Sequence, residues 1–268
     1  MTGLDPNGKT ALVTGATGGI GNAIARALHG RGATVKVTGR RAEVLEELAR
    51  ELGDRVEVLP ADLASADDVR RLAGEAGEVD VLVANAGLPG TGKLTEYSPE
   101  QIDRVLDVNL RSAVHLTHAL LPGLIKRASG HLIYISSISG KVASPQASLY
   151  NATKFGLRGF SLALHDDLRE SGVGVTTIFP GFISDAGMWA DSKLDAPSGS
   201  GVRKPEDVAD AVLKALAKNP REIDVAGVIP RVGGKLAGAA PALVAGMQRR
   251  SGGEKVSAAL ADAQREKR

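Results

Sequence analysis

Tyr150 and Lys154 lie four residues apart in the segment SLYNATKFGL, which covers residues 148–157. On a helix, two residues at this spacing share one face. A phenol has an ordinary pKa of about 10, and a neighbouring ammonium group lowers it by favouring the phenolate. The pair could therefore act as a proton donor and acceptor near neutral pH. Because the spacing also arises by chance, a tyrosine ring that is merely buried on a helix is the alternative.

A glycine-rich segment near the N-terminus has the pattern of a dinucleotide-binding site. The stretch TALVTGATGGIGNAIARAL begins as a predicted strand and ends as an amphipathic helix, with glycines between them at positions 15, 18, 19 and 21. Glycines let the backbone turn tightly and approach a pyrophosphate, which the free N–H groups of the helix N-terminus then bind. A plain strand–helix turn, which also favours glycine, is the alternative.

The end of the second predicted strand bears on which dinucleotide is bound. NAD sites have an acidic residue about 20 residues past the glycines, where it accepts a hydrogen bond from the ribose 2′-hydroxyl. Here Gly39 stands at that place, Arg40 and Arg41 follow, and residues 23–41 contain no Asp or Glu. Guanidinium groups suit a 2′-phosphate through charge-assisted hydrogen bonds. We therefore expect NADP(H) to be favoured over NAD(H); the alternative is a pair of solvated arginines at a helix start.

Polar or small residues also follow the other predicted strands. Asp62 follows the third, Asn85-Ala86-Gly87 follow the fourth, and Ser137 follows the fifth, thirteen residues before Tyr150. Ligands of open α/β sheets bind at the carboxyl ends of the strands. These residues are therefore candidates for the same site, although Asp62 and Asn85 could each be a turn residue only.

The elements that must position these residues alternate along the chain. Short apolar runs are separated by stretches of helical periodicity, and the runs are TALVTG, TVKVTG, RVEVLPA, VDVLVANAG, HLIYIS, GVTTIFPG and EIDVAGV. This alternation predicts an α/β domain whose parallel sheet is covered by helices on both faces. The longest helical stretch runs over residues 99–127. Residues 185–204 are polar and rich in Gly, Ser and Ala, which indicates a lid or a disordered segment.

Composition excludes several classes of function. The absence of cysteine rules out disulfides, thiolate metal sites and a cysteine nucleophile. A net charge of +2 is too small to indicate nucleic-acid binding. His115 and His118 have no further candidate ligands near them in the sequence, so we expect surface or interface residues and no metal site. The N-terminus has no apolar core of a signal peptide and no apolar run is long enough to span a bilayer, so we expect a cytoplasmic protein.

Together the motifs resemble those of the short-chain dehydrogenase/reductase family over about residues 8–227. The resemblance rests on residues in family order and at family spacing: Thr14-Gly15-x-x-x-Gly19-x-Gly21, Asn85-Ala86-Gly87, Asn109, Ser137, Tyr150-x-x-x-Lys154 and Pro180-Gly181. It implies a single Rossmann-type, doubly wound parallel sheet of about seven strands in the order 3-2-1-4-5-6-7. It also implies an oxidoreductase that transfers a hydride between NADP(H) and a carbonyl or secondary alcohol. A non-catalytic NADP(H)-binding sensor and an epimerase or dehydratase of the same fold are the alternatives.

The resemblance assigns roles to individual residues. Tyr150 would be the acid/base, Ser137 would hold the substrate oxygen, Lys154 would bind the nicotinamide ribose, and Asn109 would help connect a water from Lys154 to solvent. The Lys154 ammonium and an oxidised nicotinamide would together favour the phenolate. The expected substrate contacts are Ser137, Tyr150, Met188 and Trp189. The expected cofactor contacts are Gly15, Thr17, Gly18, Gly19, Ile20, Gly21, Arg40, Arg41, Asp62, Leu63, Asn85, Ala86, Gly87, Tyr150, Lys154, Pro180, Gly181 and Ile183. Association into a homodimer or homotetramer would use the helices that contain Asn109 and Lys154.

Two features depart from the family pattern. Asp185 stands where the family usually has a threonine that holds the nicotinamide amide. The other departure is the C-terminus: we expect a catalytic domain over residues 1–230, with a lid at about 185–204, and a helical, basic extension over residues 231–268.

The extension contains the segment KLAGAAPALVAGMQRR, residues 235–250, in which an apolar set falls near one helical face: Leu236, Ala240, Leu243 and Met247. We expect residues 231–250 to be ordered against the protein, near the lid or a subunit contact. The alternatives are an interfacial membrane helix and, for residues 252–268, a disordered tail.

Overall fold

The computed structural model describes residues 3–185, 187–190, 192, 194, 196, 200–250 and 253–265. Over these residues the chain forms a seven-stranded parallel sheet in the order β3-β2-β1-β4-β5-β6-β7, which confirms the expected fold. The strands are β1 (Thr10–Thr14), β2 (Thr34–Thr38), β3 (Val56–Val58), β4 (Val81–Ala84), β5 (Gly130–Ile135), β6 (Val173–Pro180) and β7 (Glu222–Val225).

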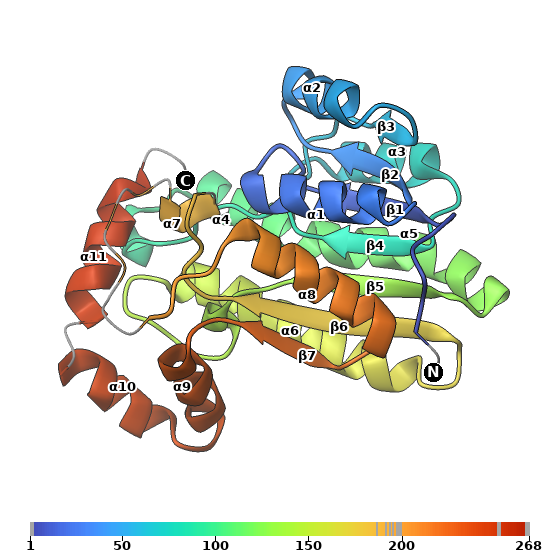
Figure 1. Ribbon diagram of the computed structural model, residues 1–268. Coiled ribbons are helices and arrows are strands. Elements are labelled where there is room, and N and C mark those ends of the chain that lie inside the picture. Colours follow the sequence, from blue (N-terminus) through green and yellow to red (C-terminus); the bar gives the residue numbers. More distant parts are fainter. Residues whose placement is uncertain are drawn as a thin grey trace.

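Helices cover both faces of the sheet (Figure 1). Their bounds are α1 (Gly19–Gly30), α2 (Ala42–Leu52), α3 (Ala66–Ala76), α4 (Pro99–Leu106), α5 (Ser112–Arg127), α6 (Ser148–Asp167), α7 (Gly187–Ala190), α8 (Pro205–Lys218), α9 (Val228–Ala239), α10 (Pro241–Arg250) and α11 (Gly253–Ala263). One core cluster packs α1, α2 and α8 on one face, and a second packs α3, α5 and α6 on the other. Successive strand side chains alternate between the two clusters, as in β1, where Val13 joins the first and Leu12 the second.

The strand register brings the candidate residues to one edge of the sheet. Thr14 pairs with Thr38, Ala84 with Tyr134, and Pro180 with Val225. Because all the strands run parallel, the residues that follow them emerge at the same edge. The glycine loop, the arginine pair, the segment after β4 and the serines after β5 are therefore neighbours in space although they are far apart in sequence.

The expected single helix over residues 99–127 is wrong in its middle. Helix α4 ends at Leu106, a π-helical turn, η2 (Asp107–Arg111), follows, and α5 continues from Ser112. The Ser112 N–H donates to the Asp107 carbonyl five residues back, which widens the turn. Asn109 lies in this turn rather than in a regular helix. Apolar periodicity does not reveal a single widened turn, because the stripe on either side keeps its spacing.

The C-terminal extension forms three helices beyond the carboxyl edge of the sheet, coloured red in Figure 1. The expected continuous apolar face through Leu236, Ala240, Leu243 and Met247 is wrong, because α9 ends at Ala239 and Ala240 has φ −141°. Pro241 then starts α10, where a proline fits because the first helical residues need no intrahelical N–H bond. The segment for which composition suggested a disordered tail contains α11.

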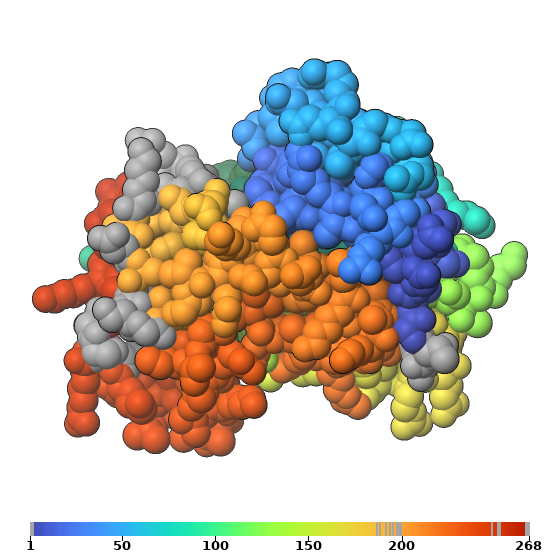
Figure 2. Space-filling model, viewed as in Figure 1, coloured from blue at the N-terminus to red at the C-terminus, as the bar shows by residue number. Residues whose placement is uncertain are grey.

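In the space-filling view the red C-terminal residues gather at that same end of the molecule (Figure 2). No helix among the described residues has both the length and the apolar character needed to cross a membrane.

Candidate active site

A cavity of about 910 Å³ opens at the carboxyl edge of the sheet. Its walls come from the loops after β1, β2, β3, β4, β5 and β6, from the first turns of α6, and from α9, α10 and α11. Ligand sites of enzymes have this order of volume and this position in open α/β sheets. The site residues predicted from the sequence are therefore expected to line this cavity.

The glycine loop approaches its neighbours so closely that side chains are excluded. Gly15 has φ +68°, a left-handed conformation that favours glycine. A Cβ atom on Gly21 would lie 2.3 Å from the Gly15 carbonyl oxygen. Gly18 caps α1 without a side chain, and the first turn of α1 has no acidic residue. The unpaired N–H groups of this turn and the positive end of the helix dipole therefore stay available to an anion.

The Asn85 side chain fastens this loop to the end of β4. Its Nδ2 donates to the carbonyl oxygens of Thr14, at 2.9 Å, and Gly15, at 3.3 Å. The Thr14 hydroxyl accepts the N–H groups of Asn85 and Ala86, both at 3.0 Å. The asparagine thus fixes the distance between the two loops, and Ala86 and Gly87 line the cavity beside it.

The arginine pair and Asp62 lie in the same part of the cavity. Arg40 and Arg41 are both exposed and line it, and Arg41 Nη2 donates to the Thr17 carbonyl oxygen at 2.8 Å. A Cβ on Gly39 would lie 2.9 Å from Thr17 Cγ2, so Thr17 would have to move to admit an acidic residue there. Asp62 accepts from the Ala64 N–H and faces Arg104, while its neighbour Leu63 also lines the cavity. The three arginines outnumber the single carboxylate of Asp62, so this end of the cavity has a net positive charge among its lining residues.

Ser137, Tyr150 and Lys154 meet at the centre of the cavity. The Tyr150 N–H donates to the Gly90 carbonyl at 3.1 Å, which docks the start of α6 on the loop after β4. Lys154 Nζ lies 5.6 Å from the centre of the Tyr150 ring and donates to the Ile135 carbonyl oxygen at 3.0 Å. Both side chains are almost fully buried, with 9% and 3% of their surfaces exposed. The i, i+4 pair therefore projects from α6 into the cavity as the spacing predicted.

Burial shifts the two pKa values in opposite directions. It raises the pKa of Tyr150 to about 12, an effect that a hydrogen bond with Ser137 partly offsets. It lowers the pKa of Lys154 to about 8, because a buried ammonium loses hydration. In the chain alone the phenol therefore stays protonated at neutral pH, ready to donate its proton.

Hydrogen bonds distinguish Ser137 from the neighbouring serines, Ser136 and Ser139. The Ser136 hydroxyl is buried and donates to the Lys154 carbonyl oxygen at 3.1 Å, so it serves to hold α6. The Ser137 oxygen accepts the Ser139 N–H at 3.1 Å, which leaves its own proton to give to Tyr150 or to a ligand. Among these three, Ser137 is the one that also contacts Tyr150.

Asn109 lies behind the cavity wall. Its Oδ1 accepts the Leu88 N–H at 2.6 Å, its Nδ2 donates to the Leu88 carbonyl at 2.9 Å, and the same Nδ2 is 3.4 Å from Thr153 Oγ1. A Cβ on Gly87 would lie 3.6 Å from both Asn109 Oδ1 and Lys154 Nζ. Asn109 thus holds the loop after β4, and Gly87 of that loop lies beside Lys154.

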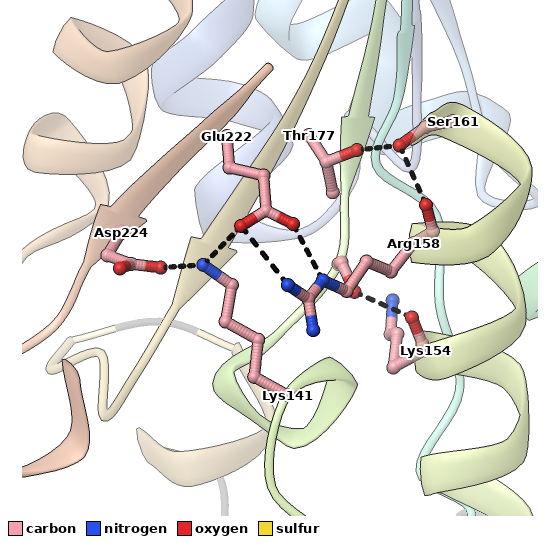
Figure 3. Close-up of polar contacts among 8 residues, drawn as sticks. Lys141, Lys154, Arg158, Ser161, Thr177, Glu222 and Asp224 are labelled. Atoms are coloured by element: carbon pink, nitrogen blue, oxygen red, sulfur yellow. Dashed lines mark hydrogen bonds and ion pairs between the residues drawn. The ribbon is translucent and has the colours of Figure 1, made fainter. Parts of the chain in front are cut away.

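A group of charges around the buried side chain of Lys141 lies beside the centre, on the side of β7 (Figure 3). Lys141, just after the short 3-10 turn η3 (Ile138–Gly140), donates to Asp224 at 2.5 Å and pairs with Glu222 at 2.9 Å. Arg158, one turn beyond Lys154 on α6, reaches Glu222 at 2.6 Å. Burial alone would raise the pKa of the Glu222 carboxyl, but Arg158 and Lys141 hold it below its ordinary value. The group therefore ties the Ser137 turn, helix α6 and strand β7 together.

Nearly all the sequence-predicted site residues line this one cavity, including Pro180, Gly181, Ile183 and Trp189. Asn109 does not, as described above. Asp185 is exposed, has φ 60° and accepts from the Ser184 hydroxyl at 2.7 Å, so it does not line the cavity either. The Met188 side chain and residues 186, 191, 193, 195 and 197–199 of the expected lid lie outside the described residues, whereas Gly187 and Trp189 of that segment line the cavity. His115 and His118 are exposed on α5, and no metal-ligand cluster occurs among the described residues.

Sequence reasoning missed the wall that the C-terminal helices build. Its lining residues are Val228, Ile229, Pro230, Val232, Gly233, Leu236, Val244, Met247, Val256, Ser257, Leu260 and Gln264. The amphipathic pattern of the extension was the available signal, but it does not say against which part of the domain an apolar face packs.

Comparison with known proteins agrees with this arrangement. Residues 9–196 match the family model described as short chain dehydrogenase. An uncharacterized oxidoreductase of Staphylococcus aureus (strain USA300) is 36% identical over 222 residues, covering 81% of this chain and 94% of that protein. A short-chain dehydrogenase from Sphingobium yanoikuyae in complex with NADPH has a TM-score of 0.77 at 26% identity, covering 88% of this chain and 94% of that one.

The 3-ketoacyl-(acyl-carrier-protein) reductase of Brucella melitensis complexed with NADH has a TM-score of 0.75 at 27% identity, covering 83% of this chain and 98% of that one. The seven-stranded parallel sheet in the order β3-β2-β1-β4-β5-β6-β7 agrees with these likenesses. The chain therefore belongs to the short-chain dehydrogenase/reductase family.

Proposed function

We propose that this protein is an NADP(H)-dependent oxidoreductase that interconverts a carbonyl group and a secondary alcohol. The observation that carries the proposal is the meeting of Ser137, Tyr150 and Lys154 in the cavity that the glycine loop also lines. Two structures similar to it hold NADPH and NADH, which supports a nicotinamide cofactor. The exposed guanidinium groups of Arg40 and Arg41 support the phosphorylated form.

The residues present fit such a cofactor. Gly15 and Gly21 leave no room for side chains where the backbone must approach a pyrophosphate, and the bare N-terminus of α1 suits its charge. Arg40 and Arg41 would hold the 2′-phosphate, and Lys154 would donate to the hydroxyls of the nicotinamide ribose. When bound, the cofactor supplies or takes the hydride.

The chain itself handles the substrate oxygen and its proton. Ser137 would donate a hydrogen bond to the carbonyl oxygen and hold it against Tyr150. The Tyr150 hydroxyl, protonated because burial raises its pKa to about 12, would then give its proton to that oxygen as negative charge develops on it. The positive charge of Lys154 would stabilise the phenolate that remains. Asn109 would keep the loop after β4 in place beside Lys154, next to the path by which a water could return the proton.

The proposal is tested by following NADPH consumption with a panel of ketones, aldehydes, quinones and acyl thioesters. We expect turnover with at least one carbonyl class and its loss in Tyr150→Phe, because the ring stays in place while the proton donor is removed. NADPH titration of the same variant should give nearly the wild-type affinity. A Tyr150→Phe protein that keeps most of its activity would make Tyr150 a structural residue and favour a different mechanism.

A further inference from the structure

The charged residues of the cavity are gathered in one half of it. Among the described lining residues, Arg40, Arg41, Asp62, Arg104 and Lys154 are the ones that carry charge, and they lie on the side of the glycine loop and the β4 loop or at the centre. The opposite half, formed by residues 137–147 and by α9, α10 and α11, contributes no charged side chain. A substrate with a carboxylate, ammonium or phosphate close to its reacting carbon would find no charged partner among these described residues and would lose its hydration.

The same half contains large apolar residues that line the cavity and are accessible to solvent. Of the large hydrophobic residues that the described chain leaves exposed, five line this wall: Val228, Ile229, Val232, Leu236 and Met247. Val228 and Ile229 have 72% and 66% of their surfaces accessible. Contiguous apolar surface of this kind marks a site where an apolar partner is bound, since leaving it in water costs free energy.

The wall is held in place against the catalytic centre. Gly234 of α9 packs on the turn after Ser137, where a Cβ would lie 3.4 Å from Ile138 Cδ1 and from Lys141 Cβ. At the other side, the buried side chains of Thr91 and Gln264 hydrogen-bond at 2.7 Å, which joins the end of α11 to the loop after β4. Both anchors belong to segments that also carry Ser137 or dock Tyr150, so the wall continues directly from the reacting atoms.

The length of the wall indicates the shape of the ligand. Its residues on α9 run from Val228 to Leu236, which is about 12 Å along the helix at 1.5 Å per residue. Ser137 and Tyr150 offer their hydroxyl groups at the reacting end, and the other polar lining residues of this half are uncharged: Ser139, Ser144, Gln146, Ser257 and Gln264. A molecule with one polar end and an extended hydrocarbon part matches this distribution.

We infer that the substrate is an uncharged ketone or secondary alcohol whose hydrocarbon chain lies along α9 and under α10 and α11. The inference rests on the proposed function for the position of the carbonyl at Ser137 and Tyr150. The C-terminal extension thereby acts as the part of the enzyme that selects the substrate.

Kinetics with methyl ketones from 2-butanone through 2-hexanone and 2-octanone to 2-decanone test the inference. Burying a methylene gains about 0.8 kcal/mol, or about fourfold, so we expect kcat/KM to rise by at least about 100-fold from 2-butanone to 2-decanone. Equal kcat/KM across the series, with turnover present, would overturn the inference and leave the proposed function standing.

Two matched variants test whether the wall built by the C-terminal helices causes the chain-length dependence of kcat/KM. Leu236→Asp places a carboxylate in the wall, and we expect it to abolish most of the rise of kcat/KM from 2-butanone to 2-decanone. Leu243→Asp is the control, because Leu243 is 60% exposed on α10 but does not line the cavity. In this variant kcat/KM should still rise steeply with the chain length of the ketone. NADPH titration and circular dichroism establish that both variants are folded. If kcat/KM depended on chain length to the same extent in the two variants, the inference would be overturned.

A binding measurement separates this inference from the proposed chemistry. Trp189 is the only tryptophan of the chain and lines the cavity, so its fluorescence reports binding without turnover. In Tyr150→Phe we expect saturable quenching that is tighter for 2-decanol than for 2-butanol. If this dependence holds while no ketone is reduced by the wild type, the inference stands and the proposed function fails. Indifference of the binding to chain length would overturn the inference.

Discussion

At the residue scale, Tyr150 and Lys154 respond to the same burial in opposite ways. From the sequence we expected the Lys154 ammonium and an oxidised nicotinamide together to favour the phenolate. In the chain alone the loss of hydration dominates and holds the pKa of Tyr150 at about 12. The free protein is thus prepared for proton donation, which is the reductive direction, and the phenolate needs the additional positive charge that a bound oxidised nicotinamide brings.

The lowered pKa of Lys154 predicts a pH dependence of cofactor binding. The buried ammonium has a pKa of about 8 instead of 10.5, so it is charged below pH 8 and neutral above it. If the ammonium binds the ribose, the affinity for NADPH should fall by up to about tenfold for each pH unit above 8. Titrations from about pH 7 to about pH 10 measure this, and Lys154→Met should bind more weakly with a flat profile. A wild-type affinity that stays constant over this range would refute the ribose contact.

Arg40 carries the prediction of cofactor preference. Its guanidinium is exposed in the cavity wall, while Arg41 already donates to the Thr17 carbonyl, so Arg40 is the freer of the two to hold a 2′-phosphate. We expect Arg40→Asp to raise KM for NADPH by about 10- to 100-fold and to spare NADH. Arg31→Asp, at the opposite end of α1, is the charge-matched control and should change neither value. Equal kcat/KM of the wild type for the two cofactors would contradict the preference itself.

At the element scale, the group of charges around Lys141 connects stability to the site. Lys141 is 6% exposed, contacts Asp224 and Glu222, and lies 4.0 Å from the centre of the Phe179 ring. Lys141→Met removes the ammonium group that pairs with Asp224, whereas Glu222 keeps its ion pair with Arg158. We expect a loss of roughly 2–4 kcal/mol in the free energy of unfolding, toward the low end for buried pairs because both carboxylates keep some contact with water.

Urea denaturation measures this loss. Arg169→Met, which removes an exposed pair with Glu170, should change the free energy of unfolding by less than about 0.5 kcal/mol and serves as the control. Because Lys141 follows the Ser137 turn, kcat should also fall in Lys141→Met under conditions where the variant is fully folded. A variant as stable as the wild type would show that the charges do not hold the turn.

The regular elements were predictable because each has a local signal. All seven strands were visible as apolar runs between glycine, proline and polar residues, and their order followed from the family motifs. The π-helical turn at Asp107–Arg111 was not predictable, since it shifts hydrogen bonds without changing the apolar spacing. Among the site residues, Tyr150, Lys154 and Ser137 were visible by spacing, and Asn85 by its place after a predicted strand. Lys141 was not visible, because it acts through a contact with Asp224, 83 positions away.

At the scale of the whole molecule, the sheet edge and the C-terminal helices together enclose the site. Figure 1 shows α9, α10 and α11 beyond the strand ends, where sequence reasoning expected an ordered extension but not the wall of the cavity. Which face of a helix meets which part of a domain depends on the complete fold, so composition and periodicity did not contain this information. Association into a homodimer or homotetramer through α5 and α6, where Phe155 is 40% exposed, stays a prediction.

The central claim is that this cavity transfers a hydride and that Tyr150 supplies the accompanying proton. The direct test uses NADPH deuterated at both C4 positions of the nicotinamide, with 2-decanone as the substrate and mass spectrometry of the product. The account predicts 2-decanol with one deuterium on its carbinol carbon in the wild type and no such product from Tyr150→Phe. An alcohol without deuterium, or equal labelling by the two proteins, would contradict it.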